Sequence, residues 1–438
     1  MKTHPISEKS TMKKWLPVLL VFVIVTLCQT SALAQKLSAD EQKLVTYIDA
    51  HAADIAPLLE KVVNTEAPTQ NVAGVKAIGA IYRAEFDKLG LTTKWIDMPA
   101  EMKRAGHLVA ETAQGTQGKR VLLLGHMDTV LSGEKFRLEG TRAYGTGTSD
   151  MQLGNLVILY ALKALHAQGL LKDTQIAVMI TGDEEASGKP TAISRGDMIA
   201  YAKRSDLVLS FEGAVANTAT VGRRGSSSWT LEVTGVTGHS SRIFGPQFGG
   251  GAIFEAARIL NQFYETLHGE KYLTFNPSVI VGGSSDVAMN GATGTATGKT
   301  NVVPDKVIVK GDLRFISEAQ KEAARAKMRE IVAKHLPRTD AKITFEDGIP
   351  AMTPKPDNDA LLAQLSRASE DLGFGKVAAL DPGERGAGDI AFISHLLPAL
   401  DGLGGKGGNS HAPGEWGDLE SMPMLIKRTA VLLYRLTR

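Results

Sequence analysis

Cysteine is nearly absent from this sequence. The only cysteine among the 438 residues is Cys28, in an apolar run near the start of the chain. The rest of the chain therefore has no thiol for a disulfide or for metal binding, and a bound metal must use His, Asp and Glu side chains. The sequence also contains no G-x-S-x-G nucleophile elbow and no H-E-x-x-H motif. These absences disfavour a serine or cysteine hydrolase and a helix-based zinc protease.

The chain also lacks a large excess of charge of either sign. Its formal net charge is +2, and the lysines among its first 34 residues account for that sign. No block of Lys or Arg forms the concentrated cationic face that duplex binding requires, so nucleic acid is excluded as the main partner. Hydrophobic residues make up 43% and charged residues 22% of the chain, which is typical of a globular protein.

One continuous hydrophobic run stands out, and it is short. Residues 15–28 (WLPVLLVFVIVTLC) follow Lys13 and Lys14 and precede Ala32 and Ala34, the small residues of an A-x-A cleavage site. This order is typical of a secretory signal peptide. An uncleaved anchor is the alternative, but roughly 14 residues fall short of the ~20 that span a bilayer. We therefore expect cleavage after Ala34, no stable membrane anchor in the mature protein, and a periplasmic or secreted location in a bacterium.

Residues 35–221 alternate between helical and strand patterns. Apolar residues at helical spacing predict helices over 71–89, 154–169 and 41–63, the last with a break at Pro57. Continuous apolar runs predict buried strands over 120–130, 175–185 and 205–214. Strands that are apolar throughout and alternate with helices favour a mostly parallel sheet with helices on both faces. The predicted fold class is therefore α/β, with a doubly wound sheet.

From about residue 222 the pattern changes. Strands of alternating polarity (SSWTLEVTGV, NVVPDKVIVKGDLRF and AKITFEDG) are interleaved with amphipathic helices over 251–267 and 318–336. The order β-α-β-β-α-β indicates a small α+β sandwich of ferredoxin-like type. The first pattern then returns and ends in a helix over 422–436. Because the chain is too long for one ordinary core, we place the domains as follows: signal peptide 1–34, catalytic domain 35–221 and 337–438, inserted lid domain 222–336.

Residue types that carry chemistry gather at the predicted strand ends, where parallel sheets bind ligands. His126 closes the strand at 120–125, and Asp128 is near enough to orient and polarise its imidazole. Taken alone, such a pair is more often a hydrogen-bonded structural feature. The same residue types recur at other strand ends and loops: Asp150 in GTGTSD, Asp183, Glu184 and Glu185 in TGDEE, Glu212 in SFEG, and His411 in NSHAPGEW.

A cluster of carboxylates is unfavourable without a cation, because like charges at close range resist ionising together. Two metal ions that share one carboxylate would remove this conflict. A solvated acidic loop is the alternative for residues 183–185 alone, but it does not explain the recurrence at the other strand ends.

The ordered set of these motifs resembles the M20 metallopeptidases, close to glutamate carboxypeptidases and aminoacylases. The resemblance covers nearly the whole chain after the signal peptide, including the inserted lid. It implies two zinc ions per subunit, and a donor set of nitrogen and oxygen atoms also admits cobalt or manganese. Five ligands are implied: His126 and Glu212 for one ion, Glu185 and His411 for the other, and Asp150 bridging both.

Further roles are implied by the same resemblance. Glu184 is expected to take a proton from the bridging water and pass it to the leaving amine, while Asp128 orients His126. His239 in the lid matches a histidine that stabilises the tetrahedral oxyanion, often from the partner subunit of a dimer; a turn histidine is the alternative. Lid segments that hold the substrate carboxylate in relatives are matched by Asn276, Asn301 and Arg314. An arginine fork suits a carboxylate, and a homodimer through the lid is expected.

Two segments depart from the family pattern. Residues 151–154 (MQLG) replace the Lys and paired glycines usual after the bridging Asp, which leaves the ligand itself intact. Arg385 in ERGAGDI stands where relatives with small substrates have small residues, which makes it a candidate for the specificity pocket; a surface arginine is the alternative. Arg223 and Arg224 are weaker candidates and are interpreted as domain-boundary residues.

The predicted function is hydrolysis of the amide bond next to a C-terminal amino acid with a free carboxylate, by a glutamate carboxypeptidase-like two-zinc exopeptidase. Its partner is then a small peptide or an N-acyl amino acid. Glu rather than Asp at position 212 resembles the carboxypeptidase and deacylase members. An N-acyl-amino-acid amidohydrolase and a dipeptidase are the next alternatives. A non-catalytic binding protein is disfavoured because Glu184 and all five implied ligands are present.

Overall fold

The computed structural model describes residues 37–113 and 115–438. The signal peptide predicted at 1–34 lies outside these ranges, so cleavage and export stay predictions. Within the described ranges, no helix has both the length and the apolar character that crossing a membrane requires.

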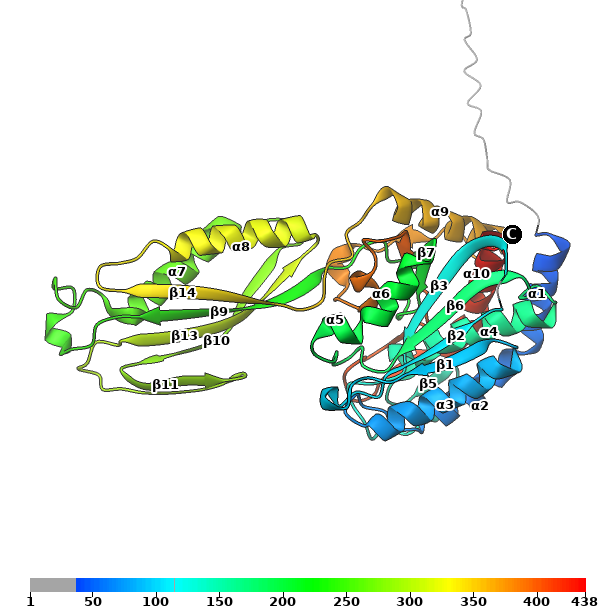
Figure 1. Ribbon diagram of the computed structural model, residues 1–438, viewed down its shortest axis with the longest axis horizontal. Coiled ribbons are helices and arrows are strands. Elements are labelled where there is room, and N and C mark those ends of the chain that lie inside the picture. Colours follow the sequence, from blue (N-terminus) through cyan, green and yellow to red (C-terminus); the bar gives the residue numbers. More distant parts are fainter. Residues whose placement is uncertain (1–36, 114) are drawn as a thin grey trace, which may run out of the picture. The chain divides into compact units, whose positions relative to one another are not determined.

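A six-stranded mixed sheet forms the centre of the α/β domain (Figure 1). Its strands lie in the order β1 (Thr92–Ile96), β2 (His107–Glu111), β6 (Thr174–Thr181), β3 (Gln117–His126), β7 (Leu207–Ser210) and β16 (Ala399–Leu400). β3 pairs in parallel with β6 and β7, and β7 pairs in parallel with β16. β1 and β2 form an antiparallel edge that the sequence analysis did not identify. The predicted α/β fold with a mostly parallel sheet is confirmed.

Apolar side chains on both sides of the central strands explain why helices cover both faces of this sheet. Val121 and Leu123 of β3 are buried in one core with α4 and α10, whereas Leu122 and Leu124 are buried in another core with α6. The helices of this domain are α1 (Ala39–Ala50), α2 (Ile55–Val63), α3 (Val72–Lys88), α4 (Leu153–Ala167), α5 (Thr191–Ser194), α6 (Gly196–Lys203), α9 (Pro356–Asp371) and α10 (Met422–Leu436).

The first predicted helix is interrupted at a different place from the one expected. α1 ends at Ala50 and α2 begins at Ile55, so the break precedes Pro57. Pro57 lies in the first turn of α2, where a helix does not need the missing N–H. The proline therefore fits the start of a helix rather than breaking one.

A four-stranded antiparallel sheet and two helices form the inserted lid. Its strands lie in the order β10 (Thr274–Gly283), β13 (Lys306–Phe315), β9 (Gly225–Thr234) and β14 (Asp340–Asp347). The helices α7 (Gly251–Leu267) and α8 (Glu318–Val332) cover this sheet (Figure 1). Trp229, Leu231 and Val233 of β9 are buried in the lid core, while the residues between them are more exposed. The β-α-β-β-α-β order agrees with the prediction, and β14 extends the lid sheet to Asp347, past residue 336.

Short strands complete the structure and link the two parts of the chain that flank the lid. The pairs are β11 (Ser285–Asn290) with β12 (Thr293–Thr297) inside the lid, and β8 (Thr218–Ala219) with β15 (Ala378–Ala379). A small sheet joins β17 (Gly407–Gly408), β18 (Trp416–Asp418), β5 (Arg142–Tyr144) and β4 (Arg137–Glu139). This sheet brings the C-terminal loop that contains His411 close to the loop that contains Asp150.

Candidate metal centre and active site

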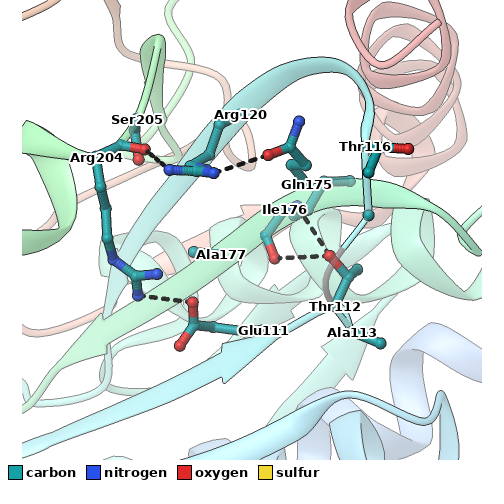
Figure 2. Close-up of a pocket in the computed structure, with 11 residues that line it drawn as sticks. Glu111, Thr112, Ala113, Thr116, Arg120, Gln175, Ile176, Ala177, Arg204 and Ser205 are labelled. Carbon is teal, nitrogen blue, oxygen red and sulfur yellow. Dashed lines mark hydrogen bonds and ion pairs between the residues drawn. The ribbon is translucent and has the colours of Figure 1, made fainter.

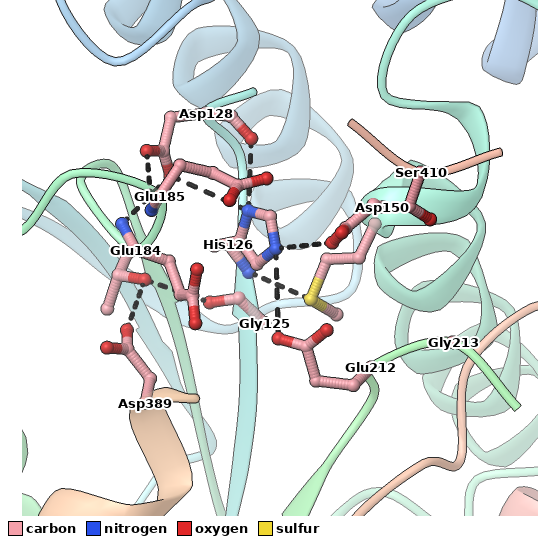
Figure 3. A network of polar contacts seen from close by, with 12 residues as sticks. Gly125, His126, Asp128, Asp150, Glu184, Glu185, Glu212, Gly213, Asp389 and Ser410 are labelled. Atoms are coloured by element: carbon pink, nitrogen blue, oxygen red, sulfur yellow. Dashed lines mark hydrogen bonds and ion pairs between the residues drawn. The ribbon is translucent and has the colours of Figure 1, made fainter. Parts of the chain in front are cut away.

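His126 is buried at the carboxyl end of β3, with 1% of its surface exposed (Figure 3). Its Nδ1 atom lies 3.0 Å from the backbone carbonyl oxygen of Asp128 and therefore donates its proton there. Its Nε2 atom faces two carboxylates, at 3.0 Å from Oδ1 of Asp150 and 3.7 Å from Oε1 of Glu212. The tautomer that Asp128 selects leaves Nε2 with a lone pair for a metal ion.

Asp150 lies between two histidines that come from distant parts of the chain. Its Oδ1 atom faces His126, and its Oδ2 atom lies 3.1 Å from Nε2 of His411. The same Nε2 atom of His411 is also 3.1 Å from Oε2 of Glu185. One carboxylate with a histidine at each oxygen is the arrangement expected of a ligand shared by two cations.

The structure brings all five implied metal ligands together, along with Glu184. Three groups of side chains have ligand atoms within 4.8 Å of one another: His126 with Asp150 and Glu212, Asp150 with Glu185 and His411, and His126 with Glu184 and Glu185. The first two groups share Asp150. They match the two ligand sets that the resemblance implies.

The chemistry of this cluster fits a pair of divalent cations. Within the described part of the chain, Oε1 of Glu185 is buried and has no hydrogen-bond partner. Burial and the nearby carboxylate of Asp150 raise the pKa of Glu212 to about 7. Hydrogen bonds to Asp150 and Glu185 raise the pKa of His411 to about 10. Without a metal, the negative charge of the cluster favours bound protons, and divalent cations can compensate the same negative charge. Every donor atom in the cluster is nitrogen or oxygen, which suits zinc.

Glu184 lies beside the proposed ligands, and a backbone hydrogen bond fixes its position. Its N–H donates to Oδ1 of Asp128 at 3.1 Å. Burial raises the pKa of the Glu184 carboxyl well above its usual value, and the charge of Glu212 raises it further. A carboxyl with a raised pKa beside a metal centre is suited to accept a proton and return it.

Asp128 holds more of the site than its sequence position suggests. It is completely buried, and its Oδ2 atom accepts from the N–H of Glu185 at 3.2 Å and from the hydroxyl of Thr69 at 2.6 Å. Its Oδ1 atom also lies 3.5 Å from Nδ1 of His126. Asp128 therefore positions the imidazole and the acidic turn together. Thr69 was missed, because a threonine before a helix gives no signal of a contact about sixty positions away.

Glu415 is a second residue that the sequence analysis missed. Its carboxylate accepts from three backbone N–H groups, at 2.7 Å from Gly147, 2.8 Å from Ser149 and 2.9 Å from Asp150. Burial raises the pKa of Glu415 to about 6. Its place in the same short loop as His411 is the signal that could have identified it. Glu415 fixes the turn that presents the shared carboxylate.

The lid brings His239 and Asn301 close together. Ser240 donates from its N–H to the carbonyl oxygen of Asn301 at 2.9 Å, and His239 forms a bridge with Val302. The imidazole of His239 is exposed and hydrogen-bonds with the hydroxyl of Ser241 at 2.8 Å. The role in oxyanion stabilisation stays a prediction.

Asn276 and Arg314 lie on neighbouring strands of the lid sheet. Asn276 in β10 is opposite Asp312 in β13, and Arg314 is two residues further along β13. Since cross-strand partners and residues two apart point to the same side, Asn276 and Arg314 share one face. Arg314 donates to Asp312 at 2.8 Å, and Asn276 to Ser278 at 3.0 Å. In the described chain, no hydrogen bond or ion pair joins these lid side chains to the acidic cluster.

Arg385 and Arg223 contact the protein around the metal centre. Arg385 donates to the carbonyl oxygen of Gly213 at 2.6 Å and to the hydroxyl of Thr220 at 3.1 Å. Gly213 directly follows the proposed ligand Glu212, so Arg385 steadies that loop. Arg223 is buried and pairs with Asp401 at 2.7 Å. A pocket role for Arg385 stays a prediction.

A cavity of about 450 Å³ lies at the amino ends of β3 and β6, away from the carboxyl ends that carry the acidic cluster (Figure 2). Its charged side chains are Glu111, Arg120 and Arg204, and each has a hydrogen-bond or ion-pair partner in the lining. Arg204 binds Glu111 at 2.6 Å, and Arg120 donates to Gln175 at 2.9 Å. Within the described residues, the groups of side chains that could hold a metal ion all lie in the acidic cluster and none lines this cavity, so the acidic cluster is the better candidate for the active site.

A protein-family model agrees with the geometry of this cluster. The model, described as peptidase family M20/M25/M40, matches residues 122–435. The chain belongs to this family. The predicted family membership and the prediction of a metallopeptidase or amidohydrolase enzyme are thereby confirmed, and the non-catalytic alternative is disfavoured.

Individual M20 relatives cover most of the chain. Carboxypeptidase G2 of Pseudomonas sp. (strain RS-16) is 29% identical over 394 residues, which cover 86% of this chain and 87% of that protein. A succinyl-diaminopimelate desuccinylase of Nitrosospira multiformis is 26% identical and covers 72% of this chain and 84% of its own length. The structure of a dinuclear metal-binding M20 peptidase from Bacillus subtilis has a TM-score of 0.61 at 15% identity, and the match covers 89% of this chain and 99% of that one. The similarities to the carboxypeptidase and the desuccinylase are consistent with peptides or amino-acid derivatives as the substrate class, and the structural match shows the fold.

Proposed function

We propose that this M20 enzyme is a two-zinc exopeptidase that hydrolyses the amide bond next to a C-terminal amino acid with a free carboxylate. The observation that carries the proposal is the placement of Asp150 between His126 and His411, with Glu212 on one side and Glu185 on the other. Such a site has a ligand set for each ion and one carboxylate for both. The similarity to a carboxypeptidase supports the choice of substrate class.

Residues of this chain have separate roles in the hydrolysis of the scissile bond. His126, Glu212, Asp150, Glu185 and His411 would hold a pair of zinc ions, which would supply polarisation of the scissile carbonyl and activation of a water molecule. Glu184 accepts the proton of that water and returns it to the nitrogen of the leaving amine. Asp128 keeps His126 in the tautomer that leaves Nε2 available, and it holds the backbone of Glu184 at the same time.

Substrate recognition is proposed for one face of the lid sheet. Arg314 and Asn276 share that face, and a guanidinium with a neighbouring amide suits the free carboxylate of a C-terminal residue. Asn301 is proposed as a further contact to this end of the substrate. Arg385 is proposed to border the pocket for the released residue, since it lies beside the loop that carries Glu212.

A homodimer through the lid is also proposed. The exposed apolar side chains of the lid include Phe244, Ile253, Phe254 and Ile280. The rings of Phe244 and Phe254 contact each other with centroids 5.6 Å apart, and Ile280 lies on the edge strand β10. A second copy that covers this patch would remove apolar surface from water. His239 would then stabilise the oxyanion, either in its own subunit or across the dimer.

Two alternatives use the same site. An N-acyl-amino-acid amidohydrolase is favoured by the similarity to a desuccinylase, and a dipeptidase is the third choice. Export to the periplasm or the medium is proposed from the signal-peptide pattern at residues 1–34.

A substrate panel tests the proposal. The purified mature protein is chelated, supplied with zinc, and mixed with N-acyl amino acids, dipeptides and longer peptides, each as the free acid and as the C-terminal amide. We expect zinc-restored release of the C-terminal amino acid from free acids only. Equal cleavage of acids and amides would contradict the carboxylate requirement, and release from dipeptides alone would favour the dipeptidase.

A further inference from the structure

One arginine close to the acidic turn is completely buried. Arg195 precedes α6, and none of its side chain is exposed to solvent. It donates from NH1 to Oδ1 of Asp183 at 2.6 Å and from NH2 to the carbonyl oxygen of the same residue at 3.1 Å. A further donation from NH2 reaches the hydroxyl of Ser187 at 2.9 Å. Arg195 therefore binds both ends of residues 183–187, the segment that contains Glu184 and Glu185.

The remaining donor of Arg195 connects this turn to a distant part of the chain. Its Nε atom donates to Oδ1 of Asp389 at 2.7 Å. The other oxygen of Asp389 accepts from the hydroxyl of Thr181 at 2.8 Å, at the end of β6. Asp389 also lies close enough to Glu184 to raise the pKa of that carboxyl (Figure 3). Arg195 and Asp389 thus connect the acidic turn to the end of β6.

Further hydrogen bonds join the two ends of the acidic turn and the residues beside it. Asp183 accepts from the N–H of Gly188 at 2.7 Å, which joins the two ends of the turn. The buried His107 has Nε2 at 2.8 Å from the carbonyl oxygen of Ser194, and its Nδ1 atom accepts from Gly182 at 3.3 Å. The planar fork of Arg195 bonds to the turn and to Asp389 together.

We propose that Arg195 is a positioning residue, paired with Asp389, that sets the place of Glu184 and Glu185 relative to the metal centre. The proposal rests on the proposed two-metal hydrolase. The simpler interpretation is that this buried arginine, here called a brace, only stabilises the fold through its two aspartates. The difference is testable, because a brace acts on stability alone, whereas a positioning residue also changes turnover and metal affinity.

The chain offers a matched control for this test. Arg435 in α10 also bridges two carboxylates, at 2.6 Å from Glu41 and 2.8 Å from Asp371, and it lies near Gly118 and Lys119 at the amino end of β3, whereas His126 is at the carboxyl end of that strand. Arg195→Lys and Arg435→Lys each keep the positive charge and remove the fork. Asp389→Asn keeps the shape of the second partner and removes its charge.

The experiment compares thermal unfolding, zinc affinity by competition with a chelator, and kcat and KM on the best substrate of the panel. Both lysine variants should lower the melting temperature. Arg195→Lys should also lower kcat and zinc affinity by about 10–100-fold with KM changed less than threefold, the range seen for groups that orient metal ligands. Arg435→Lys should leave kcat and zinc affinity as in the unaltered protein. A third arginine variant, Arg195→Met, removes the charge as well as the fork. The double variant Arg195→Met/Asp389→Asn should lose less kcat and less zinc affinity than the sum of the losses, expressed as free energies, in the two single variants.

Wild-type kcat and zinc affinity in Arg195→Lys, with a lowered melting temperature, would reduce Arg195 to a brace and overturn the proposal. If Arg195→Met fails to fold, Arg195→Lys and Asp389→Asn carry the test. If the unaltered protein releases nothing from the whole panel, the proposed function fails. The zinc affinities of the two lysine variants then still decide the role of Arg195.

Discussion

The six-stranded sheet of the α/β domain and the four-stranded sheet of the lid differ in how their strands are buried. The central strands β6 and β7, and β3 from Val121 on, are buried on both faces. The loops that follow their carboxyl ends are hydrogen-bonded to residues from distant parts of the chain. Strands β9 and β13 of the lid alternate between buried and more exposed residues, and β10 exposes most of its length.

The contrast separates two tasks. Asp128 and Glu415 hold the metal-site loops through five backbone N–H groups, which fixes the reacting groups before substrate arrives. Among the described residues, the side chains of Arg314 and Asn276 in the lid hydrogen-bond to neighbours on their own strands, Asp312 and Ser278. A preorganised site in the first sheet and an open binding face on the second are consistent with chemistry in one and substrate recognition in the other.

The largest effect is expected at the acidic turn. Glu184→Gln keeps the shape of the side chain but removes its ability to take a proton, so kcat should fall by about 10²–10⁴-fold. Bound zinc, measured by elemental analysis, should stay at the level of the unaltered protein. Turnover within a few-fold of normal would remove Glu184 from its assigned role.

The packing contrast predicts unequal costs for one substitution in the two sheets. Ile180→Ala in β6 removes a side chain with no exposed surface and should cost about 2–5 kcal/mol of unfolding free energy. Ile280→Ala in β10 changes a side chain that is 58% exposed and should stay within ~0.5 kcal/mol in dilute, monomeric samples. Urea unfolding measures both, and equal costs would contradict the description of the two sheets.

The shared carboxylate depends on Glu415. Glu415→Gln replaces a carboxylate that accepts three backbone N–H groups by an amide with one acceptor oxygen, so the turn around Asp150 should loosen. Zinc affinity should fall by about 10–100-fold. Glu420→Gln, at an exposed position a few residues on, is the control and should bind zinc as before. Similar affinities in the two variants would show that Glu415 does not position the site.

The smallest effect is expected on the lid face. Arg314→Ala should raise KM for free-acid substrates by about tenfold, since a hydrogen bond to a charged group contributes at least ~1.5 kcal/mol. The KM for the corresponding amides should change little. Arg329→Ala, an exposed arginine on α8, controls for loss of lid charge. An equal rise for acids and amides would refute the carboxylate contact.

Much of the fold could be predicted because its helices have a strong hydrophobic periodicity and its central strands are continuous apolar runs. The predicted bounds of α7 and α10 agree with the structure to the residue, since each helix has one apolar face along its whole length. The antiparallel strands β1 and β2 were missed. They are five residues long, lie at a sheet edge, and have no alternation that distinguishes them from loops.

The site residues at strand ends could be predicted because several chemically active residue types recur there in order. The groups that hold them could not. Arg195 and Thr69 act through contacts with residues far away in sequence, which leave no pattern in composition or spacing, and Glu415 acts on backbone N–H groups, with its place in the loop of His411 as its sequence signal. Their identification required the side-chain geometry.

Stepwise return of zinc to the chelated protein tests the central claim most directly. Release of the C-terminal amino acid is followed while zinc is added in fractions of one equivalent per chain. With Asp150 shared by two ions, full turnover should require two equivalents, and the chelated protein should be inactive. Turnover without metal, or full turnover at one equivalent, would contradict a two-metal site built around Asp150.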